Sequence, residues 1–189
     1  MLKLLDKLVV VEGRGEWRSH WLVVFASMVG IMIAQIHLYS LGAMMAPLER
    51  EFGWSRAEIS SGLLILSIVV FPLSPIMGIA IDRFGPRRIA LCGVTFYSLS
   101  IALLSLAQKP IWTWWLLWTL VASGCLFIKP TVWIAAVASL FTASRGLALA
   151  VTLSASGIVS SFGPLFTVFL VENFGWRTAY FLLGGLAAT

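Results

Sequence analysis

The chain has 189 residues, of which 60% are hydrophobic and only 11% are charged. Soluble domains contain about 45–50% apolar and about 25% charged residues, so this composition excludes a soluble globular domain. The net charge of +5 is spread over the borders of long uncharged segments, which excludes a basic patch for nucleic acid and indicates a multi-pass membrane protein.

Uncharged runs of about 20 residues mark the expected membrane helices, because a helix of that length crosses the hydrocarbon core. Residues 1–20 are expected to form a tail with a short interfacial segment, since charges break its apolar run and no cleavage site follows. The expected helices are 21–45, 59–81, 89–107, 111–141, 147–171 and an incomplete 178–189. The predicted fold is an all-α membrane bundle of six helices, the sixth truncated, and a fragment of a longer protein.

Lysine and arginine residues predict the orientation of this bundle. Eight of them lie on the side of the N-terminal tail and four on the opposite side. Cytoplasmic segments carry the excess of basic residues in membrane proteins. We therefore expect the N-terminus in the cytoplasm and the bundle in the cell's inner membrane.

The tripeptide Phe-Gly-Trp occurs twice, at 52–54 and at 174–176, each time just before an expected helix. We expect two outer turns in which glycine bends the chain and tryptophan lies at the membrane interface. The spacing pairs the first inter-helix loop with the fifth, whereas an inverted repeat of three helices would pair the first with the fourth. We interpret the pattern as shared turn chemistry.

The second expected helix ends on a carboxylate, and three arginines follow within six residues. A glycine among them bends the chain toward the third expected helix. The marked residues of this stretch are Gly78, Asp82, Arg83, Gly85, Arg87 and Arg88. A positively charged cytoplasmic loop would account for the arginines, but not for the carboxylate or the two glycines. The stretch resembles the signature of the major facilitator superfamily, with Pro86 where many members carry a basic residue.

This resemblance implies the N-terminal lobe of a twelve-helix transporter that works by alternating access and lacks its C-terminal lobe here. In such a lobe helices 1 and 4 line the central cavity, and helices 2 and 5 face the other lobe. The six signature residues and Arg145 are assigned to gating, with Asp82 securing the cytoplasmic gate. The Gly-Pro-Arg variant and the stretches 52–56 and 175–177 are similar to the oxalate/formate antiporter and monocarboxylate porter branch.

Lys129 lies deep inside the expected helix 111–141, and Pro130 follows it. Its distances from the two helix ends are about 27 Å and about 18 Å at 1.5 Å per residue, too far for the ammonium to reach water along the membrane normal. A charge there costs about 2.5–3.5 kcal/mol, so it should face a wet cavity or a partner. We expect Lys129 to bind an anionic substrate; the alternatives are a lysine paired for assembly or one nearer the interface.

Three residues of the first expected helix are further candidates for substrate contact. His37 shares a helix face with small residues and could titrate near neutral pH, although a packed histidine is an equal alternative. Gln35 and Tyr39 form an i, i+4 pair that could donate hydrogen bonds to substrate. Protons are the candidate coupling ion. No phosphate loop, HExxH motif or cysteine framework is present, and we expect neither cofactor nor metal.

These features predict a secondary transporter for a small organic anion such as a carboxylate, and no enzyme activity. An intramembrane serine protease is disfavoured, because the stretch 154–157 lacks the first glycine of its motif and both histidines, His20 and His37, precede it. The remaining alternative is a membrane-embedded assembly or sensor subunit that does not transport. The expected partners are the anion, the lipid bilayer and the missing C-terminal lobe.

Overall fold

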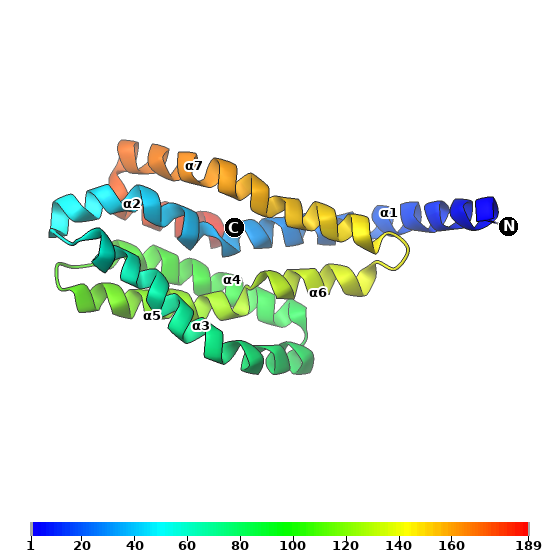
Figure 1. Cartoon of the computed structure of the whole chain (residues 1–189), viewed down its shortest axis with the longest axis horizontal. Helices are drawn as coiled ribbons and strands as arrows, with labels where there is room; N and C mark the ends of the chain where they lie inside the picture. Colours follow the sequence, from blue (N-terminus) through cyan, green and yellow to red (C-terminus); the bar gives the residue numbers. More distant parts are fainter. Residues whose placement is uncertain (1, 189) are drawn as a thin grey trace.

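The computed structural model describes residues 2–188, and within them the side chains of residues 15–81, 83–85 and 88–187. Its elements are α1 (Leu2–Ala34), α2 (Ile36–Phe52), α3 (Arg56–Phe84), α4 (Pro86–Leu103), the 3-10 helix η1 (Leu104–Leu106), α5 (Ile111–Phe127), α6 (Pro130–Leu140) and α7 (Arg145–Ala188). The described residues include no strand. The helices run along one long axis, and the start of α1 projects beyond the bundle (Figure 1).

Five helical stretches of the described part are long and apolar enough to cross a membrane. They are Gly15–Phe52, Arg56–Ile81, Arg88–Leu106, Ile111–Leu140 and Arg145–Ala187. The predicted all-α, multi-pass membrane bundle is therefore confirmed. Below, the end of the bundle that holds Gly53 is called the Gly53 end, and the opposite end, which holds Gly85, is called the Gly85 end.

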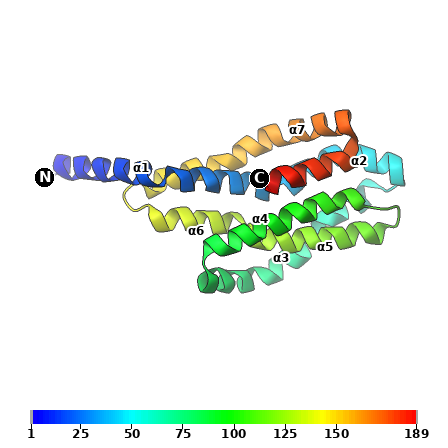
Figure 2. The same cartoon turned by 180° about the vertical axis from the view of Figure 1, so that it is seen from behind.

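Three glycines make the sharpest turns of the bundle. Gly53, Gly85 and Gly175 have φ values of 74°, 82° and 77°, a region that side chains with a Cβ rarely occupy. Gly175 divides α7 into two arms, which correspond to the predicted fifth and sixth helices. Seen from behind, the second arm folds back along α4 (Figure 2), where the backbone of Gly184 lies against Ser98 and Ala102.

The predicted helix 111–141 is wrong as one continuous helix. The structure ends α5 at Phe127 and begins α6 at Pro130, so the two lie end to end (Figure 1). Proline lacks a backbone N–H and forces the preceding residue out of the helical region, and Lys129 accordingly has an extended ψ of 147°. Lys129 therefore occupies the N-cap position of α6, the second of the two shorter helices.

The first predicted helix also differs. The residues of the tail continue into the helix without interruption, so α1 runs from Leu2 to Ala34 and α2 from Ile36 to Phe52. The helix boundary was predicted from hydropathy, but charged residues such as lysine and glutamate are good helix formers, so the end of an apolar run does not end a helix. The actual interruption lies at Gln35, deep in the expected span.

Two glycines allow the central helices to approach closely. A Cβ at Gly124 of α5 would lie 2.9 Å from the Tyr97 Cα of α4, and one at Gly62 of α3 would lie 2.5 Å from the Trp118 ring. These contacts fix α4 and α3 against α5, so the aromatic side chains between them are fully buried. Large apolar side chains on α3 and α7 remain exposed, Phe71 to 86%. Lipid or another segment must cover them.

Candidate functional site

The two helix interruptions meet at one small cavity of about 170 Å³. Residues from three places line it: Ala34 and His37 beside the first interruption, Cys125, Ile128, Lys129 and Pro130 at the second, and Leu66 and Val70 of α3. The sequence predicts that Lys129 faces a cavity or a partner and makes His37 a candidate for substrate contact, and both residues line this cavity. Unwound backbone inside a membrane protein occurs where it lines a cavity or is buried in protein.

Local hydrogen bonds stabilise both interruptions. The Gln35 N–H donates to the Met32 carbonyl over 3.2 Å, which tightens the chain into a turn. At the second interruption the Trp133 indole donates to the Ile128 carbonyl over 3.2 Å. The Trp133 ring lies against Gly30 of α1, where a Cβ would overlap the ring. The missing side chain at Gly30 thus lets α1 pack on the start of α6.

Lys129 is half-buried and donates from Nζ to the Ser74 hydroxyl of α3. Among the described residues it has no carboxylate partner, since the ion pairs found there join Arg56 to Glu49 and Arg177 to Glu51 at the Gly53 end. The positive end of the α6 helix dipole adds to the charge at this position. Two ammonium N–H groups remain for an acceptor in the cavity, so the arrangement can bind an anion.

His37 contacts a second set of polar groups. Its Nδ1 lies 2.9 Å from the Tyr97 hydroxyl and 3.6 Å from the Cys125 sulfur. The Tyr97 side chain is fully buried, and the Trp118 ring packs edge-on to the imidazole with 6.3 Å between centroids. Sequence reasoning missed Ser74, Tyr97 and Cys125, because no pattern within one helix shows what a neighbouring helix contributes.

Gln35 and Tyr39 are not among the residues that line this cavity. The Tyr39 hydroxyl donates to Gln35 Oε1 over 3.3 Å, and Gln35 Nε2 donates to the Ser156 hydroxyl of α7 over 3.1 Å. Tyr39 lines a separate apolar hollow of about 420 Å³ between the first two helices and α7. The predicted pair therefore forms, but the structure does not bring it to Lys129.

The predicted gating residues lie at the Gly85 end. Gly85 makes the turn between α3 and α4 with its positive φ. The side chains of Asp82 and Arg87 lie outside the described residues. The other predicted gating residues are exposed: Gly78, Arg83, Arg88 and Arg145. The gating role of this set stays a prediction.

A contact that the sequence did not reveal ties α1 to the loop before α7 at the Gly85 end. The Glu16 carboxylate accepts hydrogen bonds from the backbone N–H groups of Thr142, Ala143 and Ser144 and from the hydroxyls of Thr142 and Ser144, over 2.7–3.0 Å. These donors lie where α7 begins and would otherwise lack helical partners. Glu16 therefore joins the middle of α1 to the α6–α7 loop.

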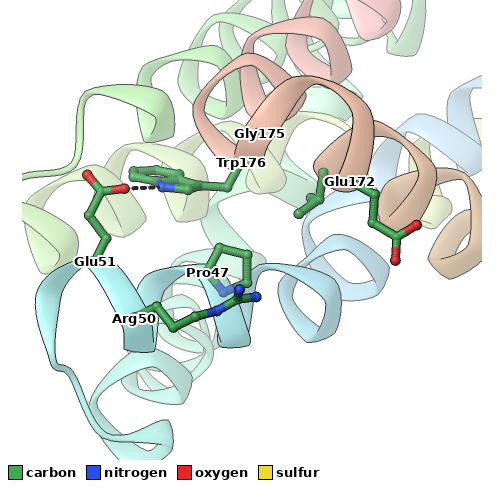
Figure 3. Close-up of a pocket in the computed structure, with 7 residues that line it drawn as sticks. Pro47, Arg50, Glu51, Glu172, Gly175 and Trp176 are labelled. Carbon is green, nitrogen blue, oxygen red and sulfur yellow. Dashed lines mark hydrogen bonds between the residues drawn. The ribbon is translucent and has the colours of Figure 1, made fainter.

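A further hollow of about 640 Å³ opens at the Gly53 end. Figure 3 shows Pro47, Arg50 and Glu51 of α2 facing Glu172 and Trp176 of α7 across it. The Trp176 indole donates to Glu51 Oε2 over 2.6 Å. This hollow is lined by both acidic and basic side chains near the end of the bundle, so it is a weaker candidate for an anion than the cavity at Lys129.

Comparison with known proteins places this chain in a family. Residues 21–189 match the model of the Major Facilitator Superfamily. The chain is 26% identical over 180 residues to "Probable anion transporter 4, chloroplastic" of Oryza sativa subsp. japonica, covering 92% of this chain and 29% of that protein. It is 26% identical over 172 residues to human "Monocarboxylate transporter 6", covering 91% and 34%.

A third relative, "Fujikurins efflux protein" of Gibberella fujikuroi, is 27% identical over 175 residues, covering 88% of this chain and 37% of the relative. The chain thus spans about a third of the length of these curated relatives. No solved structure matches the chain. The matches confirm the predicted family and its resemblance to monocarboxylate porters.

Proposed function

Because the chain belongs to the Major Facilitator Superfamily, we propose that it forms one lobe of a secondary transporter that moves a small organic anion, such as a carboxylate, by alternating access. The membrane-spanning helices and the named relatives support a transporter and not an enzyme. The proposal also assigns a site for the substrate. Lys129 is its centre.

One observation carries the proposal: an ammonium lies in a small, mostly apolar cavity at a helix interruption, with a neutral hydroxyl as its hydrogen-bond partner. Leaving such a charge without a counter-ion is costly, and an anionic substrate would neutralise it. Discontinuous helices whose N-terminal ends point at anionic groups are the arrangement that secondary transporters use. The names of the rice and human relatives, an anion and a monocarboxylate transporter, agree with this substrate class.

Alternating access assigns roles to the two ends of the bundle. The exposed apolar faces of α3 and α7 are where a second lobe would pack. In this proposal the N-terminus lies in the cytoplasm, and the membrane is the cell's inner membrane. The Gly85 end then holds the cytoplasmic gate, which includes Asp82. Protons are the candidate coupling ion of this transporter.

The experiment is uptake of labelled acetate, lactate, succinate and oxalate by proteoliposomes that hold the protein expressed from its complete reading frame, with and without a pH gradient. We expect uptake of at least one of these anions, and its loss in Lys129→Gln. Lys109→Gln is the matched control, because Lys109 is exposed at the Gly53 end. Absence of uptake of all four, with normal insertion, would favour the assembly or sensor alternative.

A further inference from the structure

Tyr97 bonds to His37 at two atoms. The His37 backbone N–H donates to the Tyr97 hydroxyl oxygen over 3.1 Å, and the same oxygen lies 2.9 Å from His37 Nδ1. A hydroxyl that accepts from a backbone N–H still has its own proton to donate. Of the two contacts, only Nδ1 can receive that proton, and it can do so only when Nδ1 is unprotonated.

The backbone bond follows from the interruption of the first helix. His37 is the second residue of α2, where N–H groups have no partner in their own helix. The Gln35 carbonyl already accepts from the N–H groups of Leu38 and Tyr39. The Tyr97 hydroxyl supplies the missing acceptor for His37, so its orientation is fixed by the main chain.

The position of Tyr97 is itself fixed by packing. Its side chain is fully buried, and its backbone lies against Gly124 of α5. On the same side of the imidazole lies the Cys125 thiol, 3.6 Å from Nδ1. Tyr97 and Cys125 both lie at Nδ1, and His37 lines the cavity that it shares with Lys129.

We propose that Tyr97 is a positioning residue that holds His37 in the tautomer with its proton on Nε2, so that the imidazole donates a hydrogen bond to the anion bound at Lys129. This inference rests on the proposed function. A carboxylate has two oxygens, and the two donors divide them: the ammonium takes one and the neutral imidazole N–H takes the other. The cavity then selects anions with a second acceptor atom beside the first.

The test compares variants that mimic one ring nitrogen each. A glutamine amide can place its N–H near the position of Nε2, whereas an asparagine amide is limited to the position of Nδ1. In the complete protein, with the best-transported anion of the acetate, lactate, succinate and oxalate panel, we expect His37→Gln to keep KM within about twofold of the unaltered protein. His37→Asn and Tyr97→Phe should each raise KM by about 2- to 10-fold with little change in maximal rate.

The decisive arm is the double variant. Tyr97→Phe added to His37→Gln should change KM no further, because glutamine carries its donor without help from Tyr97. Tyr180→Phe is the matched control, since the Tyr180 hydroxyl is buried and has no hydrogen-bond partner among the described residues. An equal effect of Tyr97→Phe in both backgrounds would overturn the inference and leave Tyr97 a structural residue.

Two further outcomes separate this inference from the function on which it rests. Normal KM in His37→Asn together with loss of binding in His37→Gln would assign the donor to Nδ1 and overturn the inference. Where Lys129→Gln abolishes binding but Tyr97→Phe and His37→Asn do not raise KM, the proposed function stands and the inference fails. Normal binding by Lys129→Gln overturns the proposed function itself. The comparison of His37→Gln with His37→Asn tests which ring nitrogen donates even where Tyr97→Phe does not fold.

Discussion

Trp176 donates its indole N–H to the Glu51 carboxylate over 2.6 Å, and this bond joins the two Phe-Gly-Trp turns of the chain. The Phe52 ring packs against Trp54 of its own turn and against Trp176 of the other. Arg177 adds an ion pair to Glu51 over 2.8 Å. The repeated tripeptide was interpreted as shared turn chemistry, and the structure adds that the two turns contact each other at one end of the bundle.

Removing the Glu51 carboxylate, which accepts the hydrogen bond from Trp176, should destabilise the protein. Glu51→Ala leaves the buried Trp176 N–H without a partner, which costs about 1–3 kcal/mol and should lower the melting temperature. Glu51→Gln keeps an acceptor oxygen and should cost less, because the ion pair with Arg177 is about half exposed. Glu49→Ala breaks the exposed pair with Arg56 and serves as the control. Equal melting temperatures for the Glu49 and Glu51 alanine variants would refute the assignment.

The close approach of α4 and α5 predicts a packing defect. Gly124→Ala places a methyl group 2.9 Å from the Tyr97 Cα, so the two helices must separate, at a cost of about 1–3 kcal/mol. Gly42→Ala is the matched control, because nothing lies within 4 Å of a Cβ at Gly42. Thermal unfolding in detergent should show a lower melting temperature for the Gly124 variant alone. A Gly124 variant as stable as the control would mean that the helices are not in contact there.

The Glu16 contact predicts local protection of the α6–α7 loop. In Glu16→Ala the donors at Thr142 and Ser144 lose their acceptor, so the loop should open more often. Trypsin added to vesicles that expose the Gly85 end should then cleave faster after Arg145. Glu172→Ala, at the other end of the bundle, should leave the cleavage rate unchanged. Equal rates in the two variants would show that Glu16 does not hold the loop.

The sequence was enough to predict the fold class and to single out Lys129, which the structure places in the lining of a small cavity. Apolar length located the spans, and the charge of Lys129 marked it as needing a cavity. Pro130 stands directly after Lys129 in the sequence, but the contacts of Trp133 with Ile128 and with Gly30 of α1 at this interruption are not evident from the sequence. The interruption at Gln35 has no proline or glycine of its own to signal it.

The features of the site that the sequence does not predict are contacts between helices. The i, i+4 spacing of Gln35 and Tyr39 predicted their mutual hydrogen bond, but not that Ser156 of α7 would be the further partner. Ser74 of α3 contacts Lys129, and Tyr97 of α4 contacts His37, and neither carries a charge or stands in a motif that would single it out. Neutral hydroxyls inside a membrane helix most often bond their own backbone, so sequence alone does not separate the few that reach across.

The central claim, that Lys129 binds the transported anion, is tested most directly by equilibrium binding of the best-transported carboxylate to the complete protein. A charge-assisted hydrogen bond contributes about 1.5–3 kcal/mol, so Lys129→Gln should weaken Kd by roughly 10- to 100-fold. Lys109→Gln should leave Kd unchanged, and Lys129→Arg should restore part of the affinity, since it keeps the charge but not the geometry. A Lys129→Gln protein with normal Kd and reduced expression would contradict the account, because it would assign the lysine to folding.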